Sequence, residues 1–367
     1  MQDLIVWRHR GGLRRTLEAI RRGSLAIGFV GGSITDGRPD NTWPEPVVAW
    51  FVENFPQARI CVENAAIGAT GSELAVFRAK RDLIDRGCHL VFIEFAVNDT
   101  GEPTERRTRT REGLIRKLLA GDGRDLILTY TFGQDHYNEM MDGKVPATIA
   151  DFEQLAEYYR IGSVWMGLHS LREIAKGRLR WEEWLPDGVH PQNRGSLSYA
   201  QSVIAFLERE LLSPASAGAM IPEGPALPPP LNPANWEHAF ILPFSEVTLD
   251  GPWALRRWLK HVWIDQALAT SAVGARLSFH FRGRGLTLAF DFGKTSAEFR
   301  YRLDAGEWKT SSRDRPGWVG DDGWYRTFPV ADDLATGEHF FELEVVHGNA
   351  ANCTGTNLRL GLIGVIP

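Results

Sequence analysis

Two short segments far apart in the chain carry residues that together could perform nucleophilic catalysis. Asp187 stands three residues before His190, so its carboxylate can accept a hydrogen bond from Nδ1 of the imidazole. That bond fixes the tautomer and leaves Nε2 free to take a proton from a hydroxyl group. The hydroxyl candidate is Ser33, which follows the apolar run 25–30 and two glycines that permit a sharp turn. The pattern predicts a serine nucleophile at a strand end, with an Asp–His pair as its base.

Two further segments also follow predicted strands. Residues 64–71 follow the apolar stretch 60–62, and residues 96–99 follow the strand-like run 89–95. Ligands of open parallel α/β sheets bind beyond the carboxyl ends of the strands. We therefore expect both segments to border the same site as Ser33.

In this order, the four segments resemble the four blocks of the SGNH (GDSL-type) hydrolases, named after serine, glycine, asparagine and histidine. The resemblance covers residues 25–210, and its most specific part is the Asp-x-x-His-Pro run before a predicted helix. It implies Ser33 as nucleophile, His190 as general base and then acid, and Asp187 as the residue that orients the imidazole. It also implies an oxyanion hole formed by the Ser33 backbone N–H, the Asn98 side-chain amide and a third backbone N–H.

Three positions depart from the usual pattern of that family. Gly32 replaces the aspartate of the GDS form, and Ala96 stands where the third block often has glycine. In the second block, the residue expected to supply a backbone N–H is Gly68 or Ala69, and the sequence does not separate them. Alanine can serve as this donor if the local φ and ψ angles are not restricted to glycine.

The elements that must position these residues are predicted from hydrophobic periodicity. The first half of the chain alternates apolar strands with amphipathic helices, which favours a parallel sheet covered on both faces. The resemblance implies a flavodoxin-like, three-layer α/β/α SGNH core, which we assign to residues 1–212. Strands are predicted near residues 25–30, 59–63, 89–95, 125–131 and 161–166.

A second domain follows a change in composition. Residues 213–235 are rich in Pro, Ala and Gly and are predicted to form a semi-extended linker. Residues 236–367 alternate apolar and polar residues with turn signals between short runs, which predicts an all-β sandwich or jelly roll. This part resembles the accessory jelly-roll modules of some SGNH carbohydrate esterases. Its many tryptophans predict docking on the hydrolase core, with Trp308, Trp318 and Trp324 as interface candidates.

Composition excludes several classes of function. With 367 residues the chain is too long for one ordinary domain. Hydrophobic content of 43% and charged content of 24% are typical of a soluble globular protein. The net charge of −5 argues against a nucleic-acid-binding surface, and no apolar segment has the length of a membrane span. The expected partner is a small-molecule or oligosaccharide ester, with no nucleic acid and no membrane, and a homo-oligomer stays open.

Cysteine and histidine usage gives no sign of a metal or another cofactor. No group of these residues has ligand spacing, so we expect neither. Cys61, Cys88 and Cys353 form an odd set and indicate buried free thiols in a reducing compartment. Residues 1–10 lack an apolar stretch long enough for a cleavable leader. We expect a cytoplasmic location, with a secreted mature form left open.

Other polar residues near the blocks have simpler interpretations. Asp99 is interpreted as a turn or cap residue and Glu94 as a buried structural partner. Asp135 and His136 are adjacent, so their side chains point apart, and the pair indicates a substrate-side loop or plain surface. A run of arginines is interpreted as a solvated helix face and comprises Arg106, Arg107, Arg109, Arg111 and Arg116.

The sequence favours an ester hydrolase that removes short acyl groups, acetyl first, from a carbohydrate alcohol through an acyl-serine intermediate. The carbohydrate part rests on the resemblance to esterases with a jelly roll. One alternative is a lysophospholipase or thioesterase, which the lack of a long apolar lid segment disfavours. Another is a non-catalytic sugar-binding protein on an inactive core, suggested by Gly32 and Ala96. The acceptor sugar and the acyl position stay open, as does whether the second domain binds sugar or only packs on the core.

Overall fold

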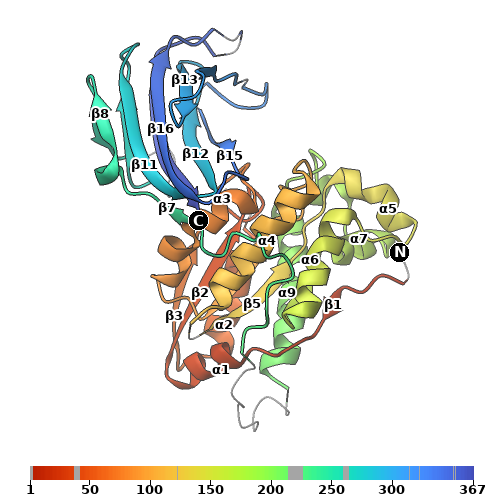
Figure 1. Ribbon diagram of the computed structural model, residues 1–367. Helices are drawn as coiled ribbons and strands as arrows, with labels where there is room; N and C mark the ends of the chain where they lie inside the picture. The colour runs from red at the N-terminus through yellow and green to blue at the C-terminus, as the bar shows by residue number, and fades with distance from the viewer. Residues whose placement is uncertain are drawn as a thin grey trace. The chain divides into compact units, whose positions relative to one another are not determined.

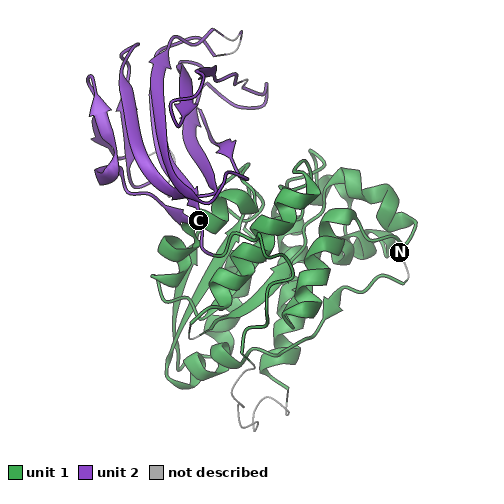
Figure 2. Cartoon of the chain, in the orientation of Figure 1, with its two compact units in different colours: residues 1–237 green, residues 238–367 purple. Residues whose placement is uncertain are grey.

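The chain folds into two compact units, residues 1–237 and 238–367 (Figure 2). Both are described from a computed structural model, and each is described by itself. The residues that the structure describes are 3–36, 42–121, 123–213, 226–258, 264–313, 315–321, 323–349, 351 and 353–367.

The first unit is built on a sheet whose strands lie in the order β1-β6-β5-β4-β2-β3 (Figure 1). Neighbouring strands are parallel except β1 and β6, which are antiparallel. Without β1, this is the strand order of a flavodoxin-like, doubly wound sheet. The predicted fold class is confirmed, whereas the edge strand β1 was not predicted. The strands are β1 (Trp7–Arg8), β2 (Ser24–Gly31), β3 (Arg59–Asn64), β4 (Leu90–Glu94), β5 (Asp125–Thr129) and β6 (Gly162–Val164).

Helices cover both faces of this sheet (Figure 1). Helices α3, α4 and α6 pack together on one face, and α2, α7 and α8 pack with α9 on the other. Among the described helices, none has the length and apolarity needed to cross a membrane. The helices are α1 (Arg14–Arg21), α2 (Pro44–Asn54), α3 (Ser72–Ala79) with the π-turn η1 (Lys80–Ile84), α4 (Thr104–Leu119), the 3₁₀ turn η2 (Gln134–His136), α5 (Tyr137–Met141), α6 (Ala147–Tyr158), α7 (Met166–Ala175), α8 (Trp181–Trp184) and α9 (Asn193–Leu211).

The order of the strands places a crevice between β2 and β4. Every residue of β4 is buried, as expected for a parallel strand covered on both faces. The chain leaves β2 toward β3 on one side and returns to β4 on the other, so connections diverge at the carboxyl ends of these two strands. This topological switch point is where open α/β sheets bind their ligands.

The second unit is a sandwich of antiparallel sheets, which confirms the predicted all-β class. One sheet has the order β15-β12-β17-β10-β9, with β7 also paired to β17, and the other has the order β14-β13-β16-β11-β8. Alternate residues of both sheets meet in an apolar core that includes Phe279, Phe290 and Phe341. Its elements are β7 (Phe240–Ile241), η3 (Phe244–Glu246), β8 (Thr248–Asp250), β9 (Ala254–Arg256), β10 (Ala267–Thr270), β11 (Arg276–Gly283), β12 (Gly285–Phe292), β13 (Glu298–Leu303), β14 (Lys309–Thr310), β15 (Trp324–Ala331), β16 (Gly337–Val346) and β17 (Leu358–Ile366).

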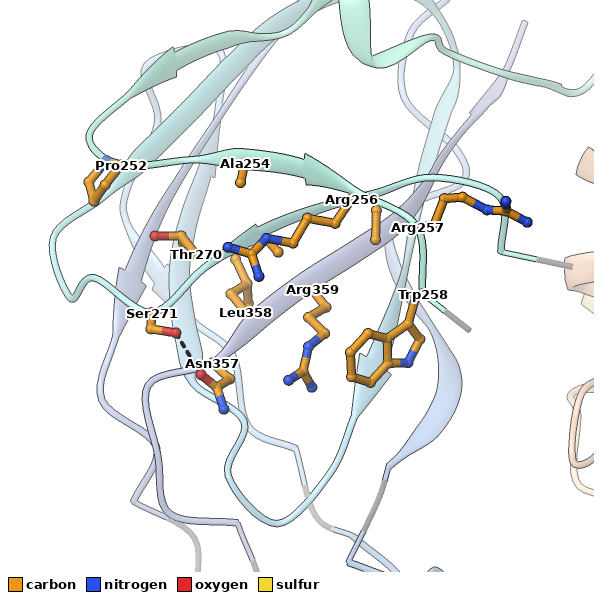
Figure 3. Close-up of a pocket in the computed structure, with 12 residues that line it drawn as sticks. Pro252, Ala254, Arg256, Arg257, Trp258, Thr270, Ser271, Asn357, Leu358 and Arg359 are labelled. Atoms are coloured by element: carbon orange, nitrogen blue, oxygen red, sulfur yellow. Dashed lines mark hydrogen bonds between the residues drawn. The ribbon is translucent and has the colours of Figure 1, made fainter. Parts of the chain in front are cut away.

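A pocket of about 200 Å³ lies over β9, β10 and β17 of the second unit (Figure 3). The guanidinium of Arg359 lies 3.9 Å from the ring centroid of Trp258 and donates to the Asp291 carboxylate at 3.2 Å. At the rim, the Ser271 hydroxyl donates to the Asn357 side-chain oxygen at 2.6 Å. The positive charge of Arg359 is therefore balanced by the Asp291 carboxylate of the same unit.

The described part of the predicted linker packs on the first unit. We call residues 226–237 the strap. Glu112 on α4 accepts the backbone N–H groups of Leu231 and Asn232 at 2.6 and 2.7 Å. Near the end of the strap, the side chain of Trp236 is fully buried, and its ring centroid lies 5.6 Å from that of Phe77. This segment is thus part of the first unit, and the compact units divide after it.

The prediction that the arginines of α4 form a solvated helix face was wrong. Arg107, Arg111 and Arg116 are all buried. Arg116 donates to the carbonyl of Pro228 in the strap at 2.6 Å, and Arg107 pairs with Asp151 on α6. Partners from distant parts of the sequence therefore cover this face.

The tryptophans after residue 235 have different environments. Trp236 belongs to the first unit, although the sequence analysis counted it with the sandwich. Trp318 is 67% exposed and makes an edge contact with Trp324. Trp308 is covered by the guanidinium of Arg302, and Trp263 lies outside the described residues. Docking of the sandwich on the hydrolase core stays a prediction.

We expect Trp236→Ala to destabilise the first unit by about 3–5 kcal/mol, because it removes a fully buried indole. The matched control Trp318→Ala removes an exposed indole and should change the free energy of unfolding by about 0.5 kcal/mol or less. Chemical denaturation of both full-length variants measures the difference. Equal stability of the two variants would contradict the place given to the strap in the hydrolase core.

Candidate active site

Ser33 lies in a tight turn directly after β2. The turn is closed by the backbone N–H of Thr35, which donates to the Gly32 carbonyl at 3.1 Å. Ser33 is 9% exposed, so its hydroxyl is sheltered at the carboxyl edge of the sheet. The Oγ atom lies 2.7 Å from Nε2 of His190, a residue 157 positions later in the chain. The fold therefore brings the predicted nucleophile and base into direct hydrogen-bond contact.

The loop that carries His190 is organised by Asp187. One carboxylate oxygen lies 2.7 Å from Nδ1 of His190, on the side of the ring opposite to Ser33. The other oxygen accepts the backbone N–H groups of Val189 at 2.9 Å and His190 at 2.7 Å. Gly188 has a φ of +84°, a conformation that glycine adopts readily. Asp187 thus holds both the imidazole and the backbone beneath it.

The protonation state of Asp187 suits this arrangement. Partial burial opposes its ionisation, but the hydrogen bonds from His190 and Val189 outweigh burial and lower the pKa of the carboxyl below its ordinary value. The group is therefore an anion at neutral pH. An anion at this place stabilises an imidazolium when His190 takes up a proton.

Asn98 meets the turn that carries Ser33 at Gly32. A Cβ atom built on Gly32 would lie 1.9 Å from the Asn98 side-chain oxygen and 2.7 Å from its nitrogen. Any side chain at position 32 would therefore push the amide away. In this structure the contact between the two segments therefore depends on glycine at position 32.

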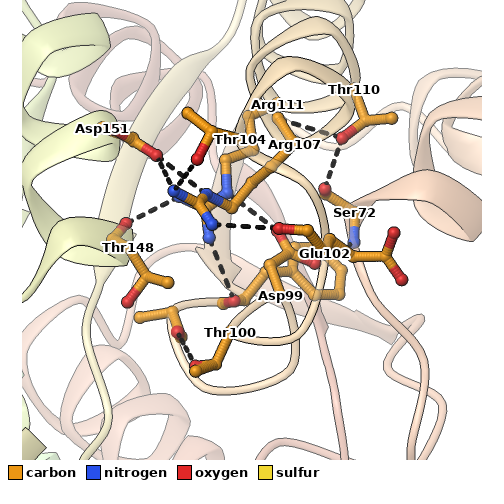
Figure 4. A network of polar contacts seen from close by, with 12 residues as sticks. Ser72, Asp99, Thr100, Glu102, Thr104, Arg107, Thr110, Arg111, Thr148 and Asp151 are labelled. Atoms are coloured by element: carbon orange, nitrogen blue, oxygen red, sulfur yellow. Dashed lines mark hydrogen bonds and ion pairs between the residues drawn. The ribbon is translucent and has the colours of Figure 1, made fainter.

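Asp99 fixes the loop that presents Asn98 (Figure 4). One oxygen of its carboxylate accepts the backbone N–H of Ser72 at 2.9 Å, at the start of α3. The other accepts Nε of Arg111 at 2.8 Å, and both side chains are almost completely buried. Arg111 also donates to the carbonyl of Thr148 on α6 at 2.6 Å. Asp99 is therefore a cap, as predicted, but it caps a helix from another segment and is neutralised by a buried arginine.

The second block forms a turn between β3 and α3. The backbone N–H of Ile67 donates to the carbonyl of Gly31 at 3.1 Å, which ties this turn to the end of β2. Ala69 has a φ of +59°, in the left-handed region that favours glycine, whereas Gly68 does not. Alanine is therefore held here with backbone strain, and the choice between Gly68 and Ala69 as the oxyanion donor stays a prediction.

Asp135 and His136 take no part in the hydrogen bonds that join Ser33, His190 and Asp187. His136 is buried and its pKa is lowered by burial, while Asp135 beside it is exposed. The neighbouring Gln134 packs against Gly188 of the His190 loop, so part of this segment borders the site. Within the described residues no group of His, Cys, Asp or Glu has the arrangement of a metal site.

Residues 29–196 match the GDSL-like Lipase/Acylhydrolase family. The match lies within the first unit and covers most of it. The resemblance seen in the four sequence blocks is thereby confirmed, and the protein belongs with the carboxylic ester hydrolases. Among curated proteins, none matches the sequence.

Two solved structures resemble this protein over nearly its whole length, and a third resembles half of it. A two-domain esterase (CEX) active on acetylated mannans, co-crystallised with mannopentaose, has 22% sequence identity and a TM-score of 0.80, covering 97% of this chain and 95% of that chain. A further structure of such a CEX esterase gives 22% identity, a TM-score of 0.79, and coverage of 97% and 96%. A variant of Axe2, an acetyl xylan esterase from Geobacillus stearothermophilus, has 20% identity and a TM-score of 0.42, covering 50% of this chain and 94% of that chain. The CEX likeness shows that the two-domain fold is shared.

We expect Ala69→Gly to stabilise the hydrolase domain by roughly 1 kcal/mol, because glycine adopts a positive φ without strain. The matched control is Ala96→Gly, at a buried position without a positive φ, which should lose about 0.5–1 kcal/mol or more. Thermal unfolding of both variants measures the two opposite signs. A loss of stability in Ala69→Gly as large as in the control would argue against strain at this turn.

Proposed function

We propose that this protein is a carbohydrate acetylesterase that works through an acyl-serine intermediate. The observation that carries the proposal is the continuous series of hydrogen bonds Ser33–His190–Asp187, with both side-chain contacts at 2.7 Å. The series lies at the switch point of the sheet, where a substrate has access. Its geometry is that of a nucleophile, its base and the group that orients the base.

The reaction proceeds in two halves. Ser33 Oγ attacks the ester carbonyl carbon while its proton passes to Nε2 of His190, and the Asp187 carboxylate stabilises the imidazolium that forms. Collapse of the tetrahedral intermediate breaks the bond to the sugar oxygen, which takes the proton from His190. Water then attacks the acyl-serine with His190 again as base, which releases acetate and restores Ser33.

The developing oxyanion needs donors beside Ser33. We assign this role to the backbone N–H of Ser33, the side-chain amide of Asn98 and the backbone N–H of Ala69. Asn98 is supported by its contact with Gly32, directly before the nucleophile. Ala69 is favoured over Gly68 because its left-handed φ is what a glycine at this block position would allow. Each such donor contributes about 3 kcal/mol to the transition state.

The substrate class rests on the two-domain architecture. The similar CEX esterase is active on acetylated mannans, and its fold matches this chain across both units. We therefore propose an acetylated oligosaccharide as the substrate, and the sandwich as an accessory module for such chains. A lysophospholipase or thioesterase would instead prefer long acyl chains, which makes chain length a discriminating measurement.

We expect the wild-type protein to hydrolyse nitrophenyl acetate faster than longer nitrophenyl esters, and Ser33→Ala to lose several orders of magnitude in kcat. The matched control Ser24→Ala removes an exposed serine at the other end of the same strand and should keep full activity. A preference for long acyl chains would favour the lysophospholipase alternative. Activity of folded Ser33→Ala close to that of the wild type would exclude Ser33 as nucleophile and revive the non-catalytic interpretation of this site.

We expect Asn98→Ala to lower kcat roughly a hundredfold with little change in KM, because the amide acts on the charge that develops in the transition state. Asn98→Asp keeps the shape of the side chain but removes both amide protons, so it should lose at least as much. Steady-state kinetics on nitrophenyl acetate separates the two constants. A change confined to KM would make Asn98 a substrate-binding residue instead.

A further inference from the structure

A buried carboxyl group lies beneath the nucleophile turn. Glu94 ends β4 and is completely shielded from solvent. One of its oxygens accepts the hydroxyl of Thr131 at 2.7 Å, and the other accepts the hydroxyl of Thr35 at 3.0 Å. The backbone N–H of Gly32 lies close enough to favour the charged form of the carboxyl and so lowers its pKa. Gly32 and Thr35 lie on either side of Ser33, so the Glu94 carboxyl acts on both ends of the turn.

The surroundings leave little freedom for any of these groups. A Cβ atom on Gly31 would lie 2.8 Å from the Glu94 carbonyl oxygen and 3.0 Å from a carboxyl oxygen, so only glycine allows β2 this close. The Thr35 hydroxyl accepts the indole N–H of Trp43 at 3.1 Å, and the Thr35 carbonyl accepts the side-chain amide of Asn64 at 2.7 Å. Glu94 therefore belongs to a fully bonded network that joins the ends of β2, β3, β4 and the segment after β5.

Among the described residues, the groups that act most strongly on the Glu94 carboxyl are neutral donors and one anion. Asp99, on the loop after β4, adds a repulsive charge, and that charge is offset by its ion pair with Arg111. Tyr199 on α9 interacts electrostatically with Glu94 and is itself buried, which raises the tyrosine pKa. Burial raises the pKa of Glu94 to about 7, against the donors Thr131, Thr35 and Gly32, which lower it.

We propose that Glu94 is a positioning residue whose carboxylate holds Gly32 and Thr35 so that Ser33 Oγ stays aligned with Nε2 of His190. This inference rests on the proposed esterase function. A carboxylate only accepts hydrogen bonds, so it can hold the two hydroxyl donors and face the Gly32 N–H at once. A protonated carboxyl carries a hydrogen of its own, so at least one of these contacts must reverse or break. The ionised form therefore holds the turn best, and that form is lost as the pH falls through about 7.

The test compares the pH dependence of kcat on nitrophenyl acetate in full-length variants. Thr131→Val removes a donor that lowers the pKa of Glu94, so the acidic limb of the profile should move to higher pH. The matched control Thr129→Val removes a buried hydroxyl two residues earlier, at the end of β5, that donates to the Ile93 carbonyl, and it should leave the limb in place. Glu94→Gln should lower kcat roughly tenfold to a hundredfold with KM unchanged, as expected for a misplaced nucleophile.

A double variant, Glu94→Gln with Thr131→Val, completes the test. Its acidic limb should coincide with that of Glu94→Gln alone, because the group that Thr131 influences is gone. Identical profiles for Thr131→Val and Thr129→Val would overturn the inference, even if Glu94→Gln proved unable to fold. So would a folded Glu94→Gln with the kcat and pH profile of the wild type. An inactive wild type would overturn the proposed function as well, whereas the other two results would leave it standing.

Discussion

The close approach of β2 to β4 at their carboxyl ends is the constraint on which the site depends. Two consecutive glycines occupy the contact, because a side chain on Gly31 would meet Glu94 and one on Gly32 would meet Asn98. At this distance the turn that carries Ser33 reaches both the carboxyl of Glu94 and the amide of Asn98. Ser33 is held at this place. A single loop, 157 residues later in the sequence, then completes the series of hydrogen bonds through His190.

A second set of interactions fixes the loop after β4 next to the contact between β2 and β4. Asp99 and Arg111 form an ion pair without solvent, and their remaining hydrogen-bonding groups are used by the start of α3 and by α6 (Figure 4). Breaking such a pair by removing one partner leaves a buried charge, which is strongly destabilising. The strap then covers the opposite part of α4 and inserts Trp236. The loop that carries Asn98 and Asp99 is therefore supported by α4, which is itself held by α6 and by the strap.

The sequence was most informative where residues with catalytic side chains directly follow a predicted strand. The four blocks and the period of the apolar residues predicted the α/β core, the β sandwich and the residues that meet around Ser33. The arginines of α4 were misjudged because a local pattern of charges does not show that Asp99, Asp151 and the strap carbonyls lie within reach. The prolines of the strap predict an extended chain, but they do not show whether that chain packs on a domain, as it does here.

Backbone conformation and the environment of buried charge were also beyond the sequence. The left-handed φ of Ala69 follows from the turn between β3 and α3 and contradicts the ordinary preference of alanine. Glu94 was expected to be buried, but its place under the nucleophile depends on the two glycines of another strand. Both features arise from contacts between segments, which residue types and spacing alone do not specify.

The central claim, that Ser33 is the nucleophile activated by His190, is tested most directly by covalent labelling. The full-length protein would be treated with a fluorophosphonate ester, digested, and examined by mass spectrometry for the modified peptide. The account predicts a single adduct on Ser33, formed rapidly in the wild type and far more slowly in His190→Ala. An adduct on another residue, or labelling of Ser33 at equal rates in the two proteins, would contradict it.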